Sequence, residues 1–549
     1  MDVTSSVAAA NARGDFRGAA GIGLGLRSRI MRRMAWRVAL AIAVGLGGLT
    51  AASLASTAAQ EVAIRARVAL RPATVSVTVR SGAPISGETV NQDLVGVDGP
   101  GPAAATVAMA AVGVRWVRTD VGFEGSYDCA TRTWDPTALD RRVDQIHAEG
   151  AQPLLIVDYT PSCLAPFSAV PAPGSINYEP PDVGTQPGGA SDQSIWQHLV
   201  TEMATHEVAR GVRAFEVWNE PDGTFWYGGL PGYLHLYADT APALEAGAVA
   251  AHCTADLHCG IEVGGPALVF PDSSWLEPFL AYVSAQHLPL DFVSWHYYGD
   301  YPLLGPYGPI PAPPGGGPPP WYNPALRAQT YGAQVAMVRA QVEHFPLLHP
   351  LLWLDEWNVD AGYDARQSGP YDAAFAAAVL DSVQSQALDR MAFFDVADSP
   401  TDPEQNWGML TGANQPKAVY WAFTFWHALA PDLLPVVLSP PGGSATAAGG
   451  IGAVGSRSPD GVVTVLLYNF VPYDPTGSNG VSPTSIYDRS IVLRVDGLGV
   501  RTYRWSRRLV DGAHNGAIVG SGAVSGSSAQ LTFPVAEDGV TLVVLTPSH

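Results

Sequence analysis

The chain has 549 residues, 47% of them hydrophobic. A chain of this length and composition can bury a large core and form more than one domain. Its formal net charge is −20 and its isoelectric point is about 4.9. Such acidity disfavours nucleic acids and anionic membrane surfaces as partners, because their phosphate groups repel a negatively charged protein.

Residues 28–59 have the organisation of a secretory signal. The basic segment that opens it contains Arg29, Arg32, Arg33 and Arg37. An apolar run from Val38 to Leu54 follows, and the small residues Thr57–Ala59 offer a cleavage site before Gln60. This pattern predicts a secreted protein that keeps no membrane span once residues 1–59 are removed. An uncleaved N-terminal anchor is the alternative, although the run is rich in glycine and short for a span.

The chain contains four cysteines, which are Cys129, Cys163, Cys253 and Cys259. Their spacing fits no zinc-binding pattern. In an exported protein an even number of cysteines indicates disulfides, and four cysteines allow three pairings. We favour Cys253–Cys259, which closes a short local loop, together with Cys129–Cys163, which ties two neighbouring loops. Four free thiols are the alternative.

Between residues 91 and 432, short β-branched or aromatic runs alternate with longer helical patterns, which is typical of βα units and a parallel sheet. The predicted strands are Asp93–Asp98, Val112–Thr119, Gln152–Tyr159, Ala214–Asn219, Ile261–Pro266, Asp291–Tyr297, Leu351–Glu356 and Arg390–Ala397. The predicted helices include Thr137–Glu149, Ile195–Ala209, Tyr233–Ala251, Trp275–Gln286, Tyr331–Phe345, Tyr371–Leu388 and Ala418–Ala430. Eight strands alternating with helices predict an α/β fold of the (β/α)8 TIM-barrel type.

After residue 432 the pattern changes to short strands separated by turn residues. Residues 433–549 therefore predict an accessory antiparallel β-sandwich. The segment Thr74–Val79 alternates apolar and polar residues ahead of the barrel. We expect residues 60–90 to add strands to that same sandwich.

Two glutamates follow apolar strands of the predicted barrel. Glu220 comes after the fourth strand, in Trp218-Asn219-Glu220-Pro221, and Glu356 ends the seventh. Catalytic side chains of such barrels lie at the carboxyl ends of the strands. Two carboxyl groups in one cleft are what a retaining glycoside hydrolase requires, one to protonate the leaving oxygen and one to attack the anomeric carbon. The alternatives are a helix-start glutamate for Glu220 and a solvated strand end for Glu356.

Neighbouring residues suggest supporting roles. Asn219 can donate a hydrogen bond to a sugar 2-hydroxyl. Asp355 should point away from Glu356 because side chains alternate along a strand, which makes Glu356 the better nucleophile. His296 and Tyr298 share a face at the end of the sixth strand, next to the seventh, where either could hydrogen-bond the nucleophile; a packed aromatic strand is the alternative. Arg118, at the end of the second strand, is a candidate partner for a carboxylate, or else forms a surface ion pair.

These motifs resemble those of retaining glycoside hydrolases that carry the acid/base on barrel strand four and the nucleophile on strand seven. Within that group the chain is most similar to glycoside hydrolase family 39, whose members include β-xylosidases and α-L-iduronidases. The segments that carry the resemblance are Glu216–Pro221, Trp295–Tyr298, Leu354–Asn358, Gly408–Thr411 and Pro416–Tyr420. It extends over residues 91–432.

The resemblance implies a double displacement with retention, with Glu220 as acid/base, Glu356 as nucleophile and Asn219 on the 2-hydroxyl. Two departures concern the substrate. The family's xylosidases tend to have Arg-x-His after strand two, where this chain has Arg118-Thr119-Asp120. Strand eight ends without a tryptophan under the reacting sugar, and Trp407 in the following loop is the candidate substitute.

The sequence therefore predicts a secreted glycosidase that acts on a carbohydrate substrate with no metal and no cofactor. Two alternatives remain open. A transglycosylase would share the covalent intermediate, and a non-catalytic carbohydrate-binding protein would retain only the barrel. Fold-level likeness is weak evidence of function by itself, so the argument depends on Glu220 and Glu356 meeting in one cleft.

Overall fold

The chain divides into two compact units, residues 1–63 and 64–549. A computed structural model describes part of the second unit, namely residues 73–165, 176–181, 192–251, 260–271, 273–299, 304–305, 308–309, 327–362, 364–402, 405–439, 450–471 and 487–548. The expected secretory signal, Cys253 and Cys259 lie outside the described residues. No helix in these ranges is both long and apolar enough to cross a membrane.

Eight parallel strands form a closed barrel. In chain order they are β2 (Gly96–Asp98), β3 (Trp116–Asp120), β6 (Gln152–Val157), β7 (Ala214–Val217), β8 (Glu262–Leu268), β9 (Phe292–Tyr298), β12 (Leu351–Asn358) and β13 (Arg390–Phe394). Each strand pairs with the next, and β13 closes the ring by pairing with β2. The predicted (β/α)8 barrel is confirmed, and each predicted strand overlaps an observed one.

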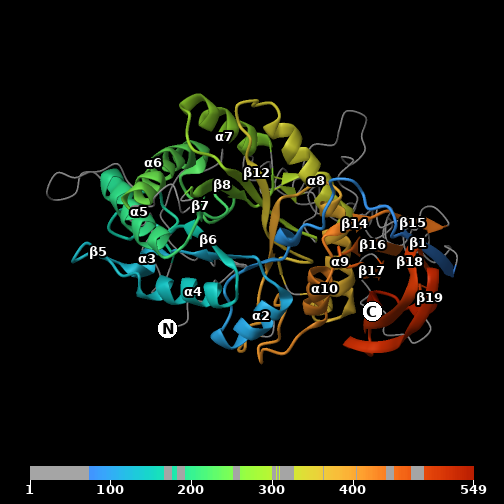
Figure 1. Ribbon diagram of the computed structural model, residues 1–549. Helices are drawn as coiled ribbons and strands as arrows, with labels where there is room; N and C mark the ends of the chain where they lie inside the picture. Colours follow the sequence, from blue (N-terminus) through green and yellow to red (C-terminus); the bar gives the residue numbers. More distant parts are fainter. Residues whose placement is uncertain are drawn as a thin grey trace, which may run out of the picture. The chain divides into compact units, whose positions relative to one another are not determined.

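Helices alternate with these strands along the chain, and several of them surround the barrel in Figure 1. They are α2 (Thr106–Val112), α4 (Thr137–Ala148), α5 (Asp192–Ala209), α6 (Gly229–Ala250), α7 (Ser273–Gln286), α8 (Arg327–Val342), α9 (Pro370–Gln384) and α10 (Ala418–His427). Short elements complete the loops: η1 (Gln92–Leu94), η2 (Ala103–Ala105), α3 (Phe123–Ser126), η5 (Ala365–Ser368), and the strand pairs β4 (Tyr127–Asp128) with β5 (Thr133–Trp134) and β10 (Leu304–Gly305) with β11 (Gly308–Pro309).

Two predicted strand starts were wrong. Val112 ends helix α2, and Gly113 terminates that helix in a left-handed conformation (φ 79°) that glycine adopts without steric cost. The second strand therefore begins only at Trp116. At the first strand, the Asn91 side chain accepts a hydrogen bond from the Asp93 amide and starts η1, which delays the strand to Gly96.

The interior of the barrel has two layers. The lower layer, near the amino ends of the strands, is a cluster of buried apolar side chains: Leu154, Ala214, Phe292 and Trp353. Below it the Arg390 guanidinium lies 4.0 Å from the centre of the Trp116 ring and is paired with Glu262. The upper layer, near the carboxyl ends, is charged and contains the buried residues Arg118, Glu216, His296 and Asp355.

The C-terminal residues form the accessory β-sandwich. Its strands are β1 (Thr74–Arg80), β14 (Asp432–Leu434), β15 (Val436–Ser439), β16 (Gly450–Arg457), β17 (Val463–Phe470), β18 (Arg489–Val510), β19 (Asn515–Val535) and β20 (Val540–Pro547). Strand β1 comes from before the barrel and pairs with β15 and β18. The β1–β18 pairing is parallel, in contrast to the antiparallel pairings of the other strands in this sheet.

The sandwich packs directly on the barrel through helices α9 and α10. Phe470 of β17 contacts the rings of Tyr371 and Phe375 on α9. Tyr468 donates a hydrogen bond of 2.6 Å to Asp381, whose pKa burial raises to about 6. This contact is polar and partly buried, so it contributes specificity as well as packing.

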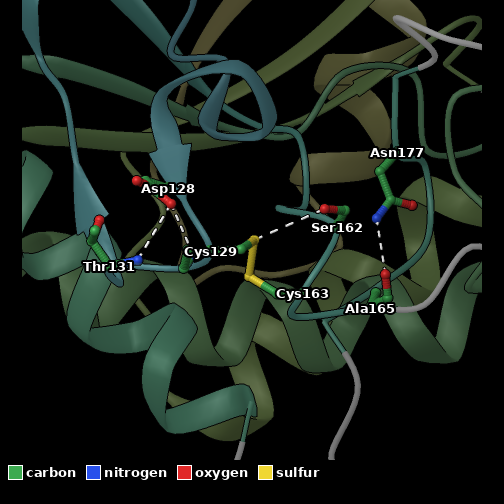
Figure 2. The surroundings of a disulfide bond; sticks show 8 residues. Asp128, Cys129, Thr131, Ser162, Cys163, Ala165 and Asn177 are labelled. Carbon is green, nitrogen blue, oxygen red and sulfur yellow. Dashed lines mark hydrogen bonds between the residues drawn. A yellow bond between two sulfur atoms is a disulfide. The ribbon is translucent and has the colours of Figure 1, made fainter.

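A disulfide joins Cys129 and Cys163, one of the two favoured pairings. Cys129 lies between β4 and β5, in the connection after β3, and Cys163 lies in the loop after β6. Figure 2 shows the bond and the hydrogen bond from Asn177 to the Ala165 carbonyl in the same loop. The bond therefore ties two neighbouring loops at the end of the barrel where the upper layer lies.

Candidate active site

The loop after β7 presents Glu220 over the barrel. The strand ends at Val217, earlier than predicted, because Trp218 and Glu220 adopt left-handed conformations with φ of 71° and 46°. Such conformations cost a residue with a side chain about 1–3 kcal/mol and concentrate at functional sites. The Trp218 indole donates to the Phe225 carbonyl, and the Glu220 amide donates to the Ala267 carbonyl. These contacts hold the loop in its strained shape.

Glu220 is buried, with only 8% of the residue exposed. Its Oε1 lies 2.9 Å from Nδ1 of His296. Burial raises the pKa of Glu220 to about 7, while the Arg118 charge acts in the opposite direction. A carboxylic acid with this pKa can hold a proton near neutral pH and release it, which is what a general acid requires.

Glu356 is also buried, with 6% of the residue exposed, but its carboxyl group has different hydrogen-bond partners. The Tyr298 hydroxyl donates a hydrogen bond of 2.5 Å to Oε1. The Arg118 guanidinium donates one of 3.1 Å to Oε2. The phenol and the guanidinium thus hold both oxygens of the Glu356 carboxyl group in place.

Asp355 does not point away from Glu356 as predicted. The register between β12 and β9 shifts between Leu354 and Glu356, so Asp355 forms a bulge and has no partner opposite it. A bulge breaks the alternation of side chains along a strand. Asp355 therefore lies inside the barrel, where its carboxyl group is 3.3 Å from Arg118 and 3.6 Å from His296.

Arg118 is the centre of the upper layer and is only 2% exposed, so its alternative reading as a surface ion pair was wrong. Its guanidinium binds Asp98 at 2.7 Å and Glu216 at 2.8 Å, in addition to Glu356. It also donates to the Asn219 amide oxygen at 2.7 Å. Because arginine only donates, this bond fixes the Asn219 amide with its NH2 group available as a donor.

His296 and Tyr298 extend from the end of β9 toward the two glutamates, as their shared face predicts. The His296 Nδ1 lies between Glu220 at 2.9 Å and Glu356 at 3.5 Å. Burial lowers the pKa of His296 to about 4, so the imidazole is neutral at neutral pH. Tyr298 also packs with Phe394 and Trp407.

Trp407 is buried in the loop after β13, and its ring centre lies 5.5 Å from that of Phe394. Its indole donates to the Gly362 carbonyl at 3.0 Å. The Asn358 amide donates to the carbonyls of both Phe394 and Trp407. Trp407 is therefore anchored beside Tyr298, on the same side of the barrel as the glutamates.

Three members of the upper layer were missed from the sequence as site residues: Asp98, Glu216 and Asp355. Glu216 carried a usable signal, because it is an acidic residue inside the apolar run of β7 and no solvated edge exists in a closed barrel. The sequence was misleading for Asp355, because the alternation of side chains along a regular strand predicts that Asp355 points away from Glu356. Asp98 ends a three-residue strand too short to show a pattern.

Two groups of side chains in the described part of the chain bring three potential metal-binding atoms within 4.8 Å of one another. One is Glu220, His296 and Glu356, and the other is Asp140, His206 and Glu207. An arginine contacts each group: Arg118 binds Glu356, and Arg210 lies 3.3 Å from Asp140. The guanidinium supplies positive charge that a metal ion would otherwise bring, so neither group is assigned as a metal site.

The same geometry sets an upper limit for the approach of the two glutamates, because one carboxyl oxygen of Glu220 lies within 4.8 Å of one from Glu356. Glu220 lies in the loop after the fourth strand of the (β/α)8 barrel and Glu356 lies in the seventh strand, and the two side chains meet at the carboxyl end of the barrel. A (β/α)8 barrel with two carboxyl groups paired at the carboxyl ends of its strands is the arrangement of glycoside hydrolases.

Comparison with known proteins identifies the family within that class. Residues 108–430, more than half of the chain, match the glycosyl hydrolases family 39, and the chain belongs to that family. A β-xylosidase of Geobacillus stearothermophilus is 26% identical over 320 residues, which cover 54% of this chain and 57% of that protein. The match thus spans a little over half the length of this relative.

Solved structures with a similar fold include two bacterial proteins. One is a family 39 enzyme from Xanthomonas axonopodis pv. citri, with a TM-score of 0.66 and 21% identity, covering 87% of this chain and 98% of that one. The other is a monomeric β-xylosidase from Caulobacter crescentus CB15, with a TM-score of 0.65 and 20% identity, covering 87% of this chain and 100% of that one. At this identity the likeness concerns the fold.

Proposed function

We propose that this protein hydrolyses O-glycosidic bonds of a carbohydrate with retention of configuration, by double displacement. The observation that carries the proposal is the pair Glu220 and Glu356, which approach within 4.8 Å and have opposite environments. Retaining enzymes place their two carboxyl groups about 5–5.5 Å apart, whereas inverting enzymes leave about 6.5–9.5 Å for a water molecule. The short separation supports retention.

In the first step, Glu356 attacks the anomeric carbon while Glu220 transfers its proton to the glycosidic oxygen. The aglycone leaves and a glycosyl ester forms on Glu356. In the second step, Glu220 takes a proton from water, the water oxygen attacks the anomeric carbon, and the ester bond to Glu356 breaks. The bonds from Arg118 and Tyr298 hold the Glu356 carboxyl group in place for attack, and burial raises the pKa of Glu220 to about 7, so that it can carry a proton near neutral pH.

Asn219 supplies the third contact with the sugar. Its NH2 group is directed by the bond between its amide oxygen and Arg118, so it can donate to the 2-hydroxyl. Such bonds strengthen as the transition state forms. Trp407 lies beside Tyr298 and offers an aromatic surface at the end of strand eight, where the chain has Phe394 in place of tryptophan.

The test begins with aryl glycosides, with β-xylosides first because the relative from Geobacillus stearothermophilus is a β-xylosidase. NMR of the first product should show the anomer of the substrate, and inversion would overturn the proposal. We expect Glu356→Gln to lower kcat by about 10⁴-fold or more. Asp381→Asn is the control, because it neutralises a partly buried carboxyl group at the contact with the sandwich.

Glu220→Gln separates the two roles. The variant should lose activity on substrates with poor leaving groups and retain the first step on dinitrophenyl glycosides, since those need no proton. Equal losses on both substrates would argue against an acid/base role. Product analysis with added acceptor sugars distinguishes hydrolysis from transfer to a second sugar.

We also propose that the protein is exported and loses residues 1–59. The disulfide between Cys129 and Cys163 supports this, because such bonds persist in oxidising compartments. N-terminal sequencing of the protein recovered from the culture medium should begin at Gln60. Recovery of full-length protein in the membrane fraction would instead indicate the anchor.

A further inference from the structure

A second pair of carboxyl groups, Glu216 and Asp355, lies in the upper layer beside the two glutamates of the proposed mechanism. Both side chains are completely buried. Both approach the same nitrogen of Arg118, whose Nε lies 2.8 Å from Glu216 Oε2 and 3.3 Å from Asp355 Oδ2. Neither takes part in the double displacement described above, so their presence inside the barrel requires a separate reason.

The oxygens of this pair are poorly satisfied as long as both groups are ionised. Glu216 Oε1 and both oxygens of Asp355 accept no hydrogen bond within the described ranges. Two carboxylates only accept, and they repel each other where water is excluded. One proton removes both problems, because a carboxylic acid can donate to the carboxylate beside it.

The charges around Arg118 lead to the same conclusion. Its guanidinium contacts four carboxyl groups, those of Asp98, Glu216, Asp355 and Glu356. His296 adds no positive charge near neutral pH, since burial lowers its pKa to about 4. One cation cannot balance four buried carboxylates, so protons must neutralise part of the set.

The environments of the pair place the proton on Asp355. Burial raises the pKa of Asp355 well above its usual value, and the neighbouring Glu216 charge adds to the effect. Burial also raises the pKa of Glu216, but the charge of Arg118 acts in the opposite direction, and the pKa of Glu216 lies below its usual value.

We propose that Asp355 is a positioning residue that stays protonated next to the nucleophile Glu356 and donates its proton to Glu216. This arrangement leaves Glu216 as a carboxylate bound to Arg118. It also places a neutral group 3.6 Å from Nε2 of His296, the ring whose Nδ1 contacts Glu220 and Glu356. The effect on activity rests on the proposed function, whereas the shared proton does not.

Infrared difference spectroscopy tests the proton directly. The spectrum of the wild type minus that of Asp355→Asn, at neutral pH, should contain the carbonyl stretch of a protonated carboxyl group. A difference that contains only carboxylate bands would overturn the proposal. Because no turnover is needed, this result decides the protonation even if the wild type cleaves no glycoside, an outcome that would overturn the proposed function alone.

Kinetics tests the positioning role. Asp355→Asn keeps a donor toward Glu216, so we expect kcat within about threefold of the wild type and an unchanged pH profile. Asp355→Ala removes the donor and should lower kcat roughly ten- to a hundredfold. If Asp355 were ionised, the asparagine variant would remove a negative charge near Glu220 and move the alkaline limb about one pH unit lower; that shift would overturn the proposal.

Glu216→Gln provides a second variant if Asp355→Asn does not fold. Its amide donates to Asp355, which then becomes the carboxylate bound to Arg118. The protonated carbonyl band should disappear while the fold is retained, and its persistence in folded Glu216→Gln would contradict the shared proton. Asp381→Asn serves as the control, with unchanged activity and an unchanged band from Asp355.

Discussion

The two layers of the barrel interior are built from many of the same strands. Strand β12 contributes Trp353 to the lower layer and Asp355 to the upper one, and β7 contributes Ala214 and Glu216. The lower layer is held by ring contacts, such as the 4.9 Å between Phe292 and Trp353. The upper layer is held by hydrogen bonds and ion pairs around Arg118.

The difference shows how a rigid apolar base supports a costly charged site. Burying carboxyl groups costs free energy unless each is paired or protonated. The upper layer meets this condition through shared partners, so its members depend on one another. The lower layer has no such dependence, because the loss of one apolar side chain leaves the others in contact.

Replacing one residue in each layer should separate stability from activity. Arg118→Met leaves four carboxyl groups without their cation and should destabilise the fold by about 3–5 kcal/mol, with activity lost in the remaining folded protein. Leu154→Ala should cost about 2–5 kcal/mol through the cavity that it creates, with kcat per folded molecule unchanged. Denaturant unfolding measures the free energy of unfolding of each variant, and kinetics measures its kcat. A large loss of kcat in Leu154→Ala would show that the lower layer also contributes to activity.

The pH dependence of activity reports on the upper layer alone. Burial raises the pKa of Glu220 to about 7, so the proton needed by the leaving group is present below pH 7 and is lost above it. We expect kcat/KM to fall about tenfold per pH unit above about pH 7. The Leu154→Ala variant should show the same fall of kcat/KM above about pH 7. A profile that stays flat to pH 9 would rule out Glu220 as the acid.

Tyr298→Phe separates the contribution of the Tyr298 hydroxyl at Glu356 from that of Arg118. It removes one hydrogen bond from Glu356 and leaves the ring in its cluster with Phe394 and Trp407. We expect kcat/KM to fall about tenfold, as for loss of a hydrogen bond to a charged group. Thermal unfolding should change little, and an unchanged kcat/KM would mean that Arg118 alone holds the nucleophile.

The smallest effect is expected outside the barrel interior. Tyr468→Phe removes the hydrogen bond to Asp381 between the sandwich and α9. The free energy of unfolding should fall by about 1–2 kcal/mol with kcat unchanged. A loss of activity would show that the sandwich contact influences the site.

Most of the barrel strands could be predicted from the sequence because their apolar runs alternate with longer helical patterns. The meeting of Glu220 and Glu356 could then be predicted as well, because the carboxyl ends of all strands in such a barrel lie at the same face. Helix α2 was missed because its seven residues, Thr106–Val112, merge with the strand after them.

The charged layer could not be predicted in the same way. Arg118 and Glu216 are far apart along the chain, and their ion pair depends on neighbouring strands in three dimensions. Alternation along a regular strand would turn the Asp355 side chain away from Glu356, but the bulge turns it into the barrel. No glycine or proline in Leu354-Asp355-Glu356-Trp357 indicates this bulge in the sequence. Register shifts of this kind are set by packing on both adjacent strands.

The proposed mechanism requires Glu356 to be the residue that forms the covalent intermediate, and this can be measured. A panel of 2-deoxy-2-fluoro dinitrophenyl glycosides should trap the glycosyl ester, and trypsin should release the label in the peptide of residues 340–366. Fragmentation of that peptide by mass spectrometry distinguishes Asp355 from Glu356. The proposed double displacement places the label on Glu356, and a label on Asp355 or Glu220 would show that another carboxyl group is the nucleophile.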